Sequence, residues 1–178
     1  MLDTCCALNL LASGHFEAIV RTPLGNQAVA YAIADVAMRE ATALRRGGGG
    51  ENAEERIPID WTSLFTNGLI RLEASATSAE LATFLSLTAQ IDDGEAMTLA
   101  LASTRGYGVV TDDRKAQRFL GGVPCLGTPD LLHNWSTNAA VDASTLGIAL
   151  RAIDDRARFV PPRAHPLRRW WNAALVVR

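Results

Sequence analysis

The sequence lacks the features that would assign it to a membrane, secreted or disulfide-rich class. No apolar run approaches the ~20 residues of a membrane span, and no basic segment precedes an apolar one, so we expect neither a span nor a signal peptide. Three cysteines occur in 178 residues, and two of them are adjacent (Cys5 and Cys6). Because this is not a disulfide framework, we interpret them as small thiols and expect a reducing cytoplasm.

Motifs for several common chemistries are also missing. The glycine run at 47–50 is not followed by GKS or GKT, so it does not predict a phosphate-binding loop. His15, His133 and His165 have no spacing typical of a zinc site or a catalytic triad. No DxD motif lies near the N-terminus, which argues against a phosphatase-like hydrolase of small phosphate esters.

Charge is unevenly distributed along a chain long enough for one domain with a real core. Residues 1–100 carry 6 Arg and no Lys against 13 Asp and Glu, whereas residues 101–178 carry 11 Lys and Arg against 6 Asp. An acidic part beside a basic part suits a metal site with flanking cations that steer a polyanion. The alternative is a solvated charged surface.

Helical and extended patterns alternate, which predicts an α/β fold with a mainly parallel sheet. Asp3 is expected where a short strand gives way to a helix that ends at Gly14. The remaining patterns predict helices at 33–44, from a capping box at Thr77-Ser-Ala-Glu80, from about Gly94, from Thr128-Pro129, at 143–158 and at 166–175, and short extended segments at 28–31, 57–61, 68–74, 109–110 and 123–126.

Acidic residues stand where the local pattern favours apolar or uncharged ones. They are Asp3, Glu40, Glu95 and Asp113, with Asp112 beside the last. Four carboxylates brought together repel unless divalent cations neutralise them, and Mg²⁺ or Mn²⁺ prefers oxygen ligands of this kind. A metal-bound water would then be the nucleophile and phosphodiester hydrolysis the reaction.

Glu40 and the neighbouring pair Asp92–Asp93 have competing interpretations. Glu40 shares a helical stripe with Ile33, Val36 and Leu44, which indicates a core-facing carboxylate, but the edge of the stripe would let it reach water. The neighbouring pair Asp92–Asp93 is interpreted as capping a helix rather than binding metal.

Four motifs in order resemble those of the PIN-domain nucleases: LDTCCALNLLASG (2–14), DVAMREA (35–41), DDGEAMTLALA (92–102) and VVTDDRKA (109–116). The resemblance covers residues 1–126 and implies a three-layer α/β/α sandwich, with 127–178 as a helical C-terminal extension packed on the same domain. It implies that Asp3, Glu40, Glu95 and Asp113 bind Mg²⁺ or Mn²⁺ and hydrolyse RNA. Asp112 would be an auxiliary ligand, and Thr111 would orient one of the acids.

The resemblance also implies partners. Many bacterial members are VapC-type toxins held inactive by a small antitoxin, although this chain is longer than the compact toxins. Arg114, Lys115 and Arg118 follow the last acid and would meet RNA phosphates, or else form a solvated face. Where the family often has Asn two places after the first acid, this chain has Cys5. The alternative function is therefore a catalytically degenerate module that binds RNA or a partner protein.

The C-terminal segment combines cations with aromatics at Arg168-Arg169-Trp170-Trp171. Such a mixture is compatible with stacking on RNA bases. We favour instead an anchoring role, in which the tryptophans pack the last helix on the domain or on a second subunit of a homodimer.

Overall fold

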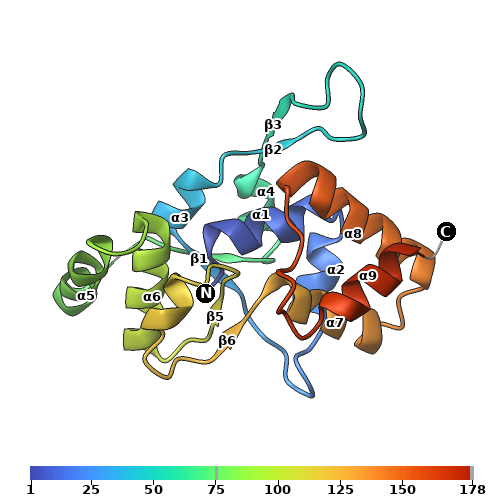
Figure 1. Ribbon diagram of the computed structural model, residues 1–178. Helices are drawn as coiled ribbons and strands as arrows, with labels where there is room; N and C mark the ends of the chain where they lie inside the picture. Colours follow the sequence, from blue (N-terminus) through green and yellow to red (C-terminus); the bar gives the residue numbers. More distant parts are fainter. Residues whose placement is uncertain (75, 177–178) are drawn as a thin grey trace. The chain divides into compact units, whose positions relative to one another are not determined.

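The computed structural model describes residues 1–74 and 76–176, and its α/β class confirms the expected one (Figure 1). The chain divides into two compact units. Unit 1 comprises 1–7, 30–42 and 60–127, and unit 2 comprises 8–29, 43–59 and 128–178. The expected boundary at 126/127 adjoins the end of unit 1, but unit 2 also takes two segments from the first part of the chain. Within the described residues, no helix has the length and apolar character that crossing a membrane requires.

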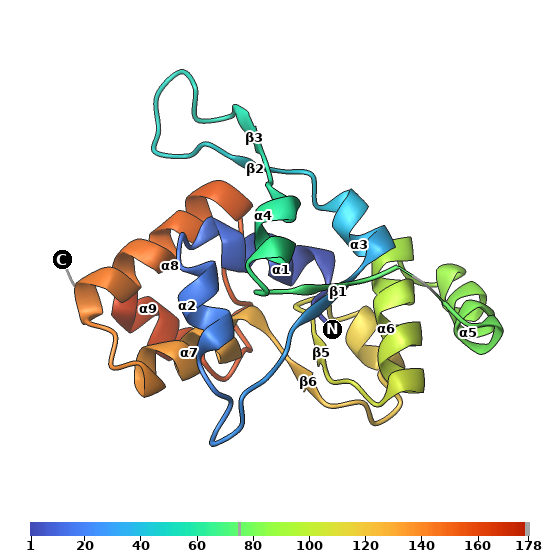
Figure 2. The same cartoon turned by 180° about the vertical axis from the view of Figure 1, so that it is seen from behind.

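Short parallel strands form the framework of unit 1. Strand β1 (Ala32–Ala34) pairs with β4 (Arg71–Glu73), and β5 (Val109–Val110) pairs with β6 (Cys125–Leu126), both in parallel. Leu2 makes one parallel bridge to Ile33 in β1 and another to Val110 in β5. The expectation of parallel pairing is thus confirmed for these two-stranded sheets, and the N-terminal segment lies between them (Figure 2).

Helix α6 (Asp93–Arg105) is the most buried helix of unit 1. Its alanines and leucines are almost all inaccessible, and it contacts β1, β5, α3 (Asp35–Glu40) and α5 (Ser78–Thr88). The helix ends at Arg105, and Gly106 follows at the C-cap position with a left-handed backbone (φ +68°), the conformation that commonly terminates helices. Unit 1 also contains α4 (Trp61–Thr66), the 3₁₀ helix η1 (Ala116–Phe119) and the first residues of α1 (Thr4–Ala12).

The expected helix at 33–44 is wrong. Only Asp35–Glu40 is helical, because Ile33 pairs with Leu72 in the β1–β4 ladder and Ala43–Arg45 forms β2. β2 pairs antiparallel with β3 (Arg56–Pro58) inside unit 2. The residues of the expected stripe through Glu40 therefore belong to two strands and a helix and do not share one helical face. The expected strand at 28–31 lies instead at Ala32–Ala34.

A capping box and an ion-pair network fix α5 in unit 1. Thr77 Oγ1 accepts from the Glu80 N–H, and Glu80 Oε2 accepts from the Thr77 N–H at 2.6 Å, as the sequence predicts. Arg105, at the end of α6, donates to Glu80 at 2.7 Å and also pairs with Glu73 of β4. The network joins α5, α6 and β4 through one guanidinium, and Glu80 is only 1% exposed.

Unit 2 is mainly helical. It contains α2 (Phe16–Arg21), α7 (Thr128–Asn138), α8 (Ala143–Ala157) and α9 (Arg168–Val176), so the expected helices at 128, 143–158 and 166–175 are confirmed. Trp171 of α9 is fully buried and meets Phe159 edge-on, with ring centroids 5.9 Å apart. Packing of the C-terminal helix, rather than base stacking, is therefore the role of this tryptophan.

The network around Arg105 makes a prediction about acid stability. Hydrogen bonds from Arg105 and from the Thr77 backbone lower the pKa of Glu80 to about 2 from an ordinary 4.5. Ionised Glu80 thus stabilises the fold above about pH 4.5, and this contribution is lost as pH falls toward about 2. Glu80→Gln retains a capping-box side chain, so we expect urea denaturation to show reduced stability at neutral pH and a difference that shrinks on acidification.

A matched control comes from an exposed pair in unit 2. Glu17 accepts from Arg21 one turn later at 2.9 Å, and both side chains are more than half exposed. Glu17→Gln should change stability little at any pH. A Glu80→Gln variant as stable as the wild type at neutral pH would contradict the structural role of the network.

Candidate functional site

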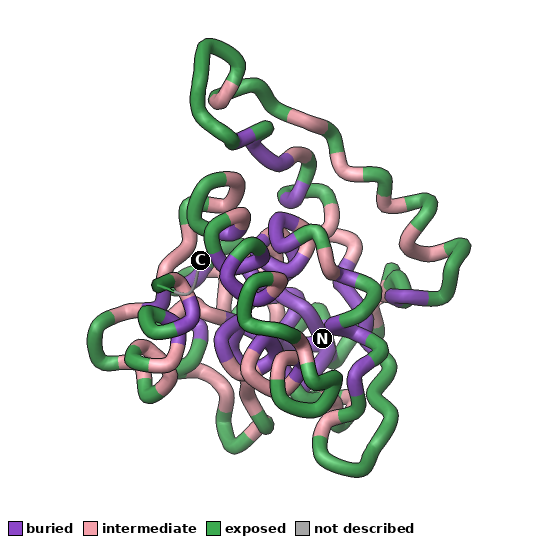
Figure 3. Tube along the Cα trace, turned by 90° about the vertical axis from the view of Figure 1, so that its right-hand side faces the viewer, coloured by how far each residue is buried: buried purple, intermediate pink, exposed green. Residues whose placement is uncertain are grey.

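Backbone pairing of the N-terminal segment places Asp3. Leu2 N donates to Ala32 O at 2.7 Å, and Asp3 N donates to Val110 O at 3.0 Å. Met1, Leu2 and Asp3 are buried, and Figure 3 draws the chain there in purple. Helix α1 then begins at Thr4. Asp3 therefore lies at the expected strand-to-helix transition, beside residues 111–113 that follow β5.

Asp3 is a buried carboxylate held by three donors. It is 1% exposed and accepts from Thr111 Oγ1 at 2.9 Å, from Cys5 Sγ at 3.0 Å and from the Thr4 N–H at 2.7 Å. Burial raises the pKa of Asp3, and the three hydrogen bonds oppose that rise. Thr111 thus contacts one of the predicted acids, as the resemblance implies, and its role in orienting a metal ligand stays a prediction. The donation from Cys5 is a contact that the sequence did not predict.

Thr111 links Asp3 to Asp113. While its hydroxyl donates to Asp3, the same oxygen accepts from the Asp113 N–H at 3.1 Å. Asp113 Oδ1 in turn accepts from the backbone N–H groups of Lys115 and Ala116, at 2.6 and 2.7 Å. These two bonds fix the carboxylate at the turn into η1. Asp113 is thus both a local cap and a neighbour of Asp3.

Glu95 lies in the first turn of α6, where the charges of other acids affect its pKa. Burial, followed by the charges of Asp3, Asp113 and Asp92, raises the pKa of Glu95 to about 7. Asp113 also raises the pKa of Asp3 through its charge. Three of the predicted acids therefore share one electrostatic environment, in which like charges oppose full ionisation. Asp92 occupies the N-cap position of α6, but its side chain makes no capping hydrogen bond, so the expected capping role is not seen there.

Glu40 reaches the same helix end from α3. Its Oε1 accepts from the Gly94 N–H at 3.0 Å and its Oε2 accepts from Thr4 Oγ1 at 2.9 Å. The residue is exposed, so the core-facing interpretation is wrong and the alternative, that it reaches water, is confirmed. A methyl group at Gly94 would overlap the Glu40 carboxylate. Glycine at this position therefore allows Glu40 to approach the residue before Glu95.

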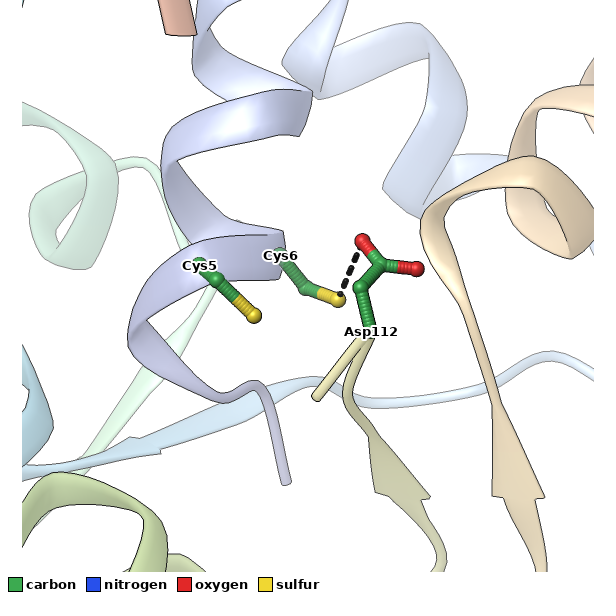
Figure 4. A group of neighbouring side chains, drawn as sticks. All are labelled: Cys5, Cys6 and Asp112. Atoms are coloured by element: carbon green, nitrogen blue, oxygen red, sulfur yellow. Dashed lines mark hydrogen bonds between the residues drawn. The ribbon is translucent and has the colours of Figure 1, made fainter. Parts of the chain in front are cut away.

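Asp112 faces thiols rather than the other acids. Cys6 Sγ donates to Asp112 Oδ2 at 3.2 Å (Figure 4). Within residues 1–74 and 76–176, the group of three or more possible metal ligands with donor atoms all within 4.8 Å of one another is Cys5, Cys6 and Asp112. That group contains none of the other four predicted acids. The sequence did contain a signal for this group. Cys5 and Cys6 follow the acid Asp3 by two and three residues, at the start of a helix.

The predicted RNA-contacting cations lie on the surface. Arg114, Lys115 and Arg118 are all exposed, and they follow Asp113 through the turn and η1. Their exposure fits contact with phosphates and a solvated face equally. Their role in binding RNA remains a prediction.

Comparisons with known protein families, with curated proteins and with solved structures find no match for this chain. The resemblance to PIN-domain nucleases therefore remains a prediction from the four motifs. Any function has to be argued from the geometry around Asp3, Glu95 and Asp113.

The raised pKa of Glu95 predicts that, in the absence of divalent cations, the free energy of unfolding falls as the pH rises. Because its folded pKa is about 7 against an ordinary 4.5, the stability associated with the neutral form is lost as pH rises through about 7. Glu95→Gln should remove this loss, with a gain on the order of 1 kcal/mol at about pH 8.5 and little effect at about pH 4.5, after allowance for solvent screening.

The measurement is urea denaturation in EDTA at both pH values. Asp35→Asn is a suitable control, since Asp35 lies on α3 and pairs with Arg39 at the surface. If Glu95→Gln and Asp35→Asn changed the pH dependence of the free energy of unfolding equally, the result would contradict a raised pKa at Glu95.

Proposed function

We propose that the chain is a metal-dependent endoribonuclease that hydrolyses RNA phosphodiester bonds, with unit 1 as the core of a PIN-like three-layer α/β/α fold. The observation that carries the proposal is the shared environment of Asp3, Glu95 and Asp113. Asp3 is buried, and the charges of Asp3 and Asp113 both raise the pKa of Glu95. Carboxylates held in mutual repulsion inside a fold are a common arrangement at functional sites.

The donor chemistry favours a hard divalent cation. Asp3, Glu95 and Asp113 offer carboxylate oxygens, which Mg²⁺ and Mn²⁺ prefer. When bound, such an ion would supply an acidified water and neutralise charge that develops on a phosphate. A positive ion there would also offset the repulsion that raises the pKa of Glu95.

Other residues of the chain would position these carboxylates. Thr111 contacts the Asp3 carboxylate and the Asp113 backbone through one hydroxyl, so it would hold these two residues near each other. Glu40 holds the Gly94 N–H and with it the first turn of α6, which carries Glu95. In this proposal Glu40 acts on the site through α6, and a role as a direct ligand follows only from the family resemblance.

RNA is the proposed substrate, since basic residues follow the acids in the sequence. The exposed Arg114, Lys115 and Arg118 would meet the polyanionic backbone and hold it near Asp113. A role as the toxin of a toxin–antitoxin pair, with a small antitoxin as partner, remains part of the same proposal.

A degenerate, non-cutting module is the second candidate. The observation in its favour is that protein donors already satisfy much of the acidic group. Cys5 donates to Asp3, and two backbone N–H groups occupy Asp113 Oδ1. Carboxylates paired in this way can remain stable without a cation.

Removal of Asp3 tests catalysis directly. With labelled RNA and Mn²⁺, we expect Asp3→Asn and Asp113→Asn each to reduce cleavage by roughly 100-fold or more, because each removes a proposed metal ligand. The surface variant Asp35→Asn should cleave like the wild type, and EDTA should stop both. Circular dichroism would show that the inactive variants remain folded.

The outcomes separate the two candidates. Cleavage retained in both Asp3→Asn and Asp113→Asn would contradict the nuclease proposal. Thermal unfolding with and without Mn²⁺ gives a second readout, because an ion that binds the folded state raises the melting temperature. Absence of cleavage together with absence of any Mn²⁺ shift would favour the degenerate module.

A further inference from the structure

Two adjacent thiols and a carboxylate converge at the start of α1. The Sγ atoms of Cys5 and Cys6 and a carboxylate oxygen of Asp112 all lie within 4.8 Å of one another (Figure 4). Cys6 is buried, whereas Cys5 and Asp112 are partly exposed. Two sulfurs and one oxygen differ from the all-oxygen set that Mg²⁺ prefers, and thiolates select softer ions.

We propose that Cys5, Cys6 and Asp112 form a binding site for a thiophilic divalent cation of the zinc class. Its donor set differs from the carboxylate set of the proposed nuclease centre. The proposal rests on the placement of three donor atoms within unit 1 and does not require the chain to cleave RNA.

The charge balance of the group favours such an ion. Each thiol donates its proton toward a carboxylate: Cys5 Sγ lies 3.0 Å from Asp3 Oδ2, and Cys6 Sγ lies 3.2 Å from Asp112 Oδ2. When one divalent cation binds, two S–H bonds break, two metal–sulfur bonds form, and two protons pass to the solvent. The net charge of the group is unchanged. The Asp112 carboxylate, which now accepts the Cys6 proton, would instead face the cation.

The spacing requires only a small contraction. Zn–S bonds of about 2.3 Å and Zn–O bonds of about 2.0–2.2 Å place the donors of a tetrahedral site roughly 3.3–3.8 Å apart. Donor atoms at the limit of 4.8 Å would close by about 1.0–1.5 Å, and closer atoms by less. The partly exposed Cys5 side chain can rotate to do so, and its exposure gives an entry route. Three protein ligands leave a fourth position for water.

A disulfide between the same cysteines is less favourable. Within residues 1–74 and 76–176 no disulfide joins the cysteines, and adjacent cysteines seldom reach the geometry of an unstrained disulfide. Cys125 lies on β6 and is not part of the group, so it provides a matched control thiol within the same unit.

The test is titration of the reduced full-length protein with Cd²⁺, followed by thiolate-to-metal charge-transfer absorption in the ultraviolet. Zn²⁺ affinity is then measured by competition with a chromophoric chelator. We expect one ion per chain with absorption from two thiolates. Cys5→Ser and Cys6→Ser should each halve the absorption and weaken affinity roughly tenfold or more, and Asp112→Asn should weaken affinity while both sulfurs still contribute. Cys125→Ser should bind like the wild type.

Several results would overturn the proposal. They are the absence of charge-transfer absorption in the wild type, full absorption in both Cys5→Ser and Cys6→Ser, and loss of absorption in Cys125→Ser. Cys6 is buried, so its variant could unfold; circular dichroism would reveal this. In that case Cys5→Ser is the decisive variant, because Cys5 is partly exposed and the proposal requires this variant to have half the charge-transfer absorption of the wild type. Since the readout is metal binding, it is independent of RNA cleavage.

Discussion

The pairing of residues 1–3 with strands on both sides is the constraint on which the arrangement of unit 1 depends. Leu2 bridges β1 and β5, and the hydrogen bond from Asp3 N to Val110 O carries the Asp3 side chain into a buried position. Burying a carboxylate destabilises a fold unless hydrogen-bond donors or cations contact it. The backbone register that buries Asp3 therefore requires such groups around its side chain. Thr111, Cys5 and the Thr4 N–H meet that requirement within the protein.

The acids around Asp3 differ in how the protein compensates them. Glu40 accepts from Gly94 and Thr4, and Asp113 accepts from two backbone N–H groups of the turn that follows it. Glu95 instead has its pKa raised by burial and by the charges of its neighbours. A divalent cation would offset the part of this rise that comes from the neighbouring charges, which links the electrostatics of unit 1 to the proposed chemistry.

The sequence predicted the features that local chemistry determines. The Thr77–Glu80 capping box and the helix start at Thr128-Pro129 follow from short-range patterns, whereas the contact of Thr111 with Asp3 spans 108 residues and was expected only from the family resemblance. The helix expected at 33–44 failed because strand pairing, a long-range effect, overrode the helical spacing on both sides of Asp35–Glu40. The contact of Cys6 with Asp112 was missed for the same reason, since the two residues are more than a hundred positions apart in the sequence.

The central claim is that Asp3, Glu95 and Asp113 bind a divalent cation. The most direct test is a crystal structure of the protein soaked in Mn²⁺, with anomalous scattering used to locate the ion. We expect an anomalous peak in coordination contact with the carboxylates of Asp3, Glu95 and Asp113, and its loss in Asp3→Asn crystals. Well-ordered carboxylates with no peak between them at saturating Mn²⁺ would contradict it.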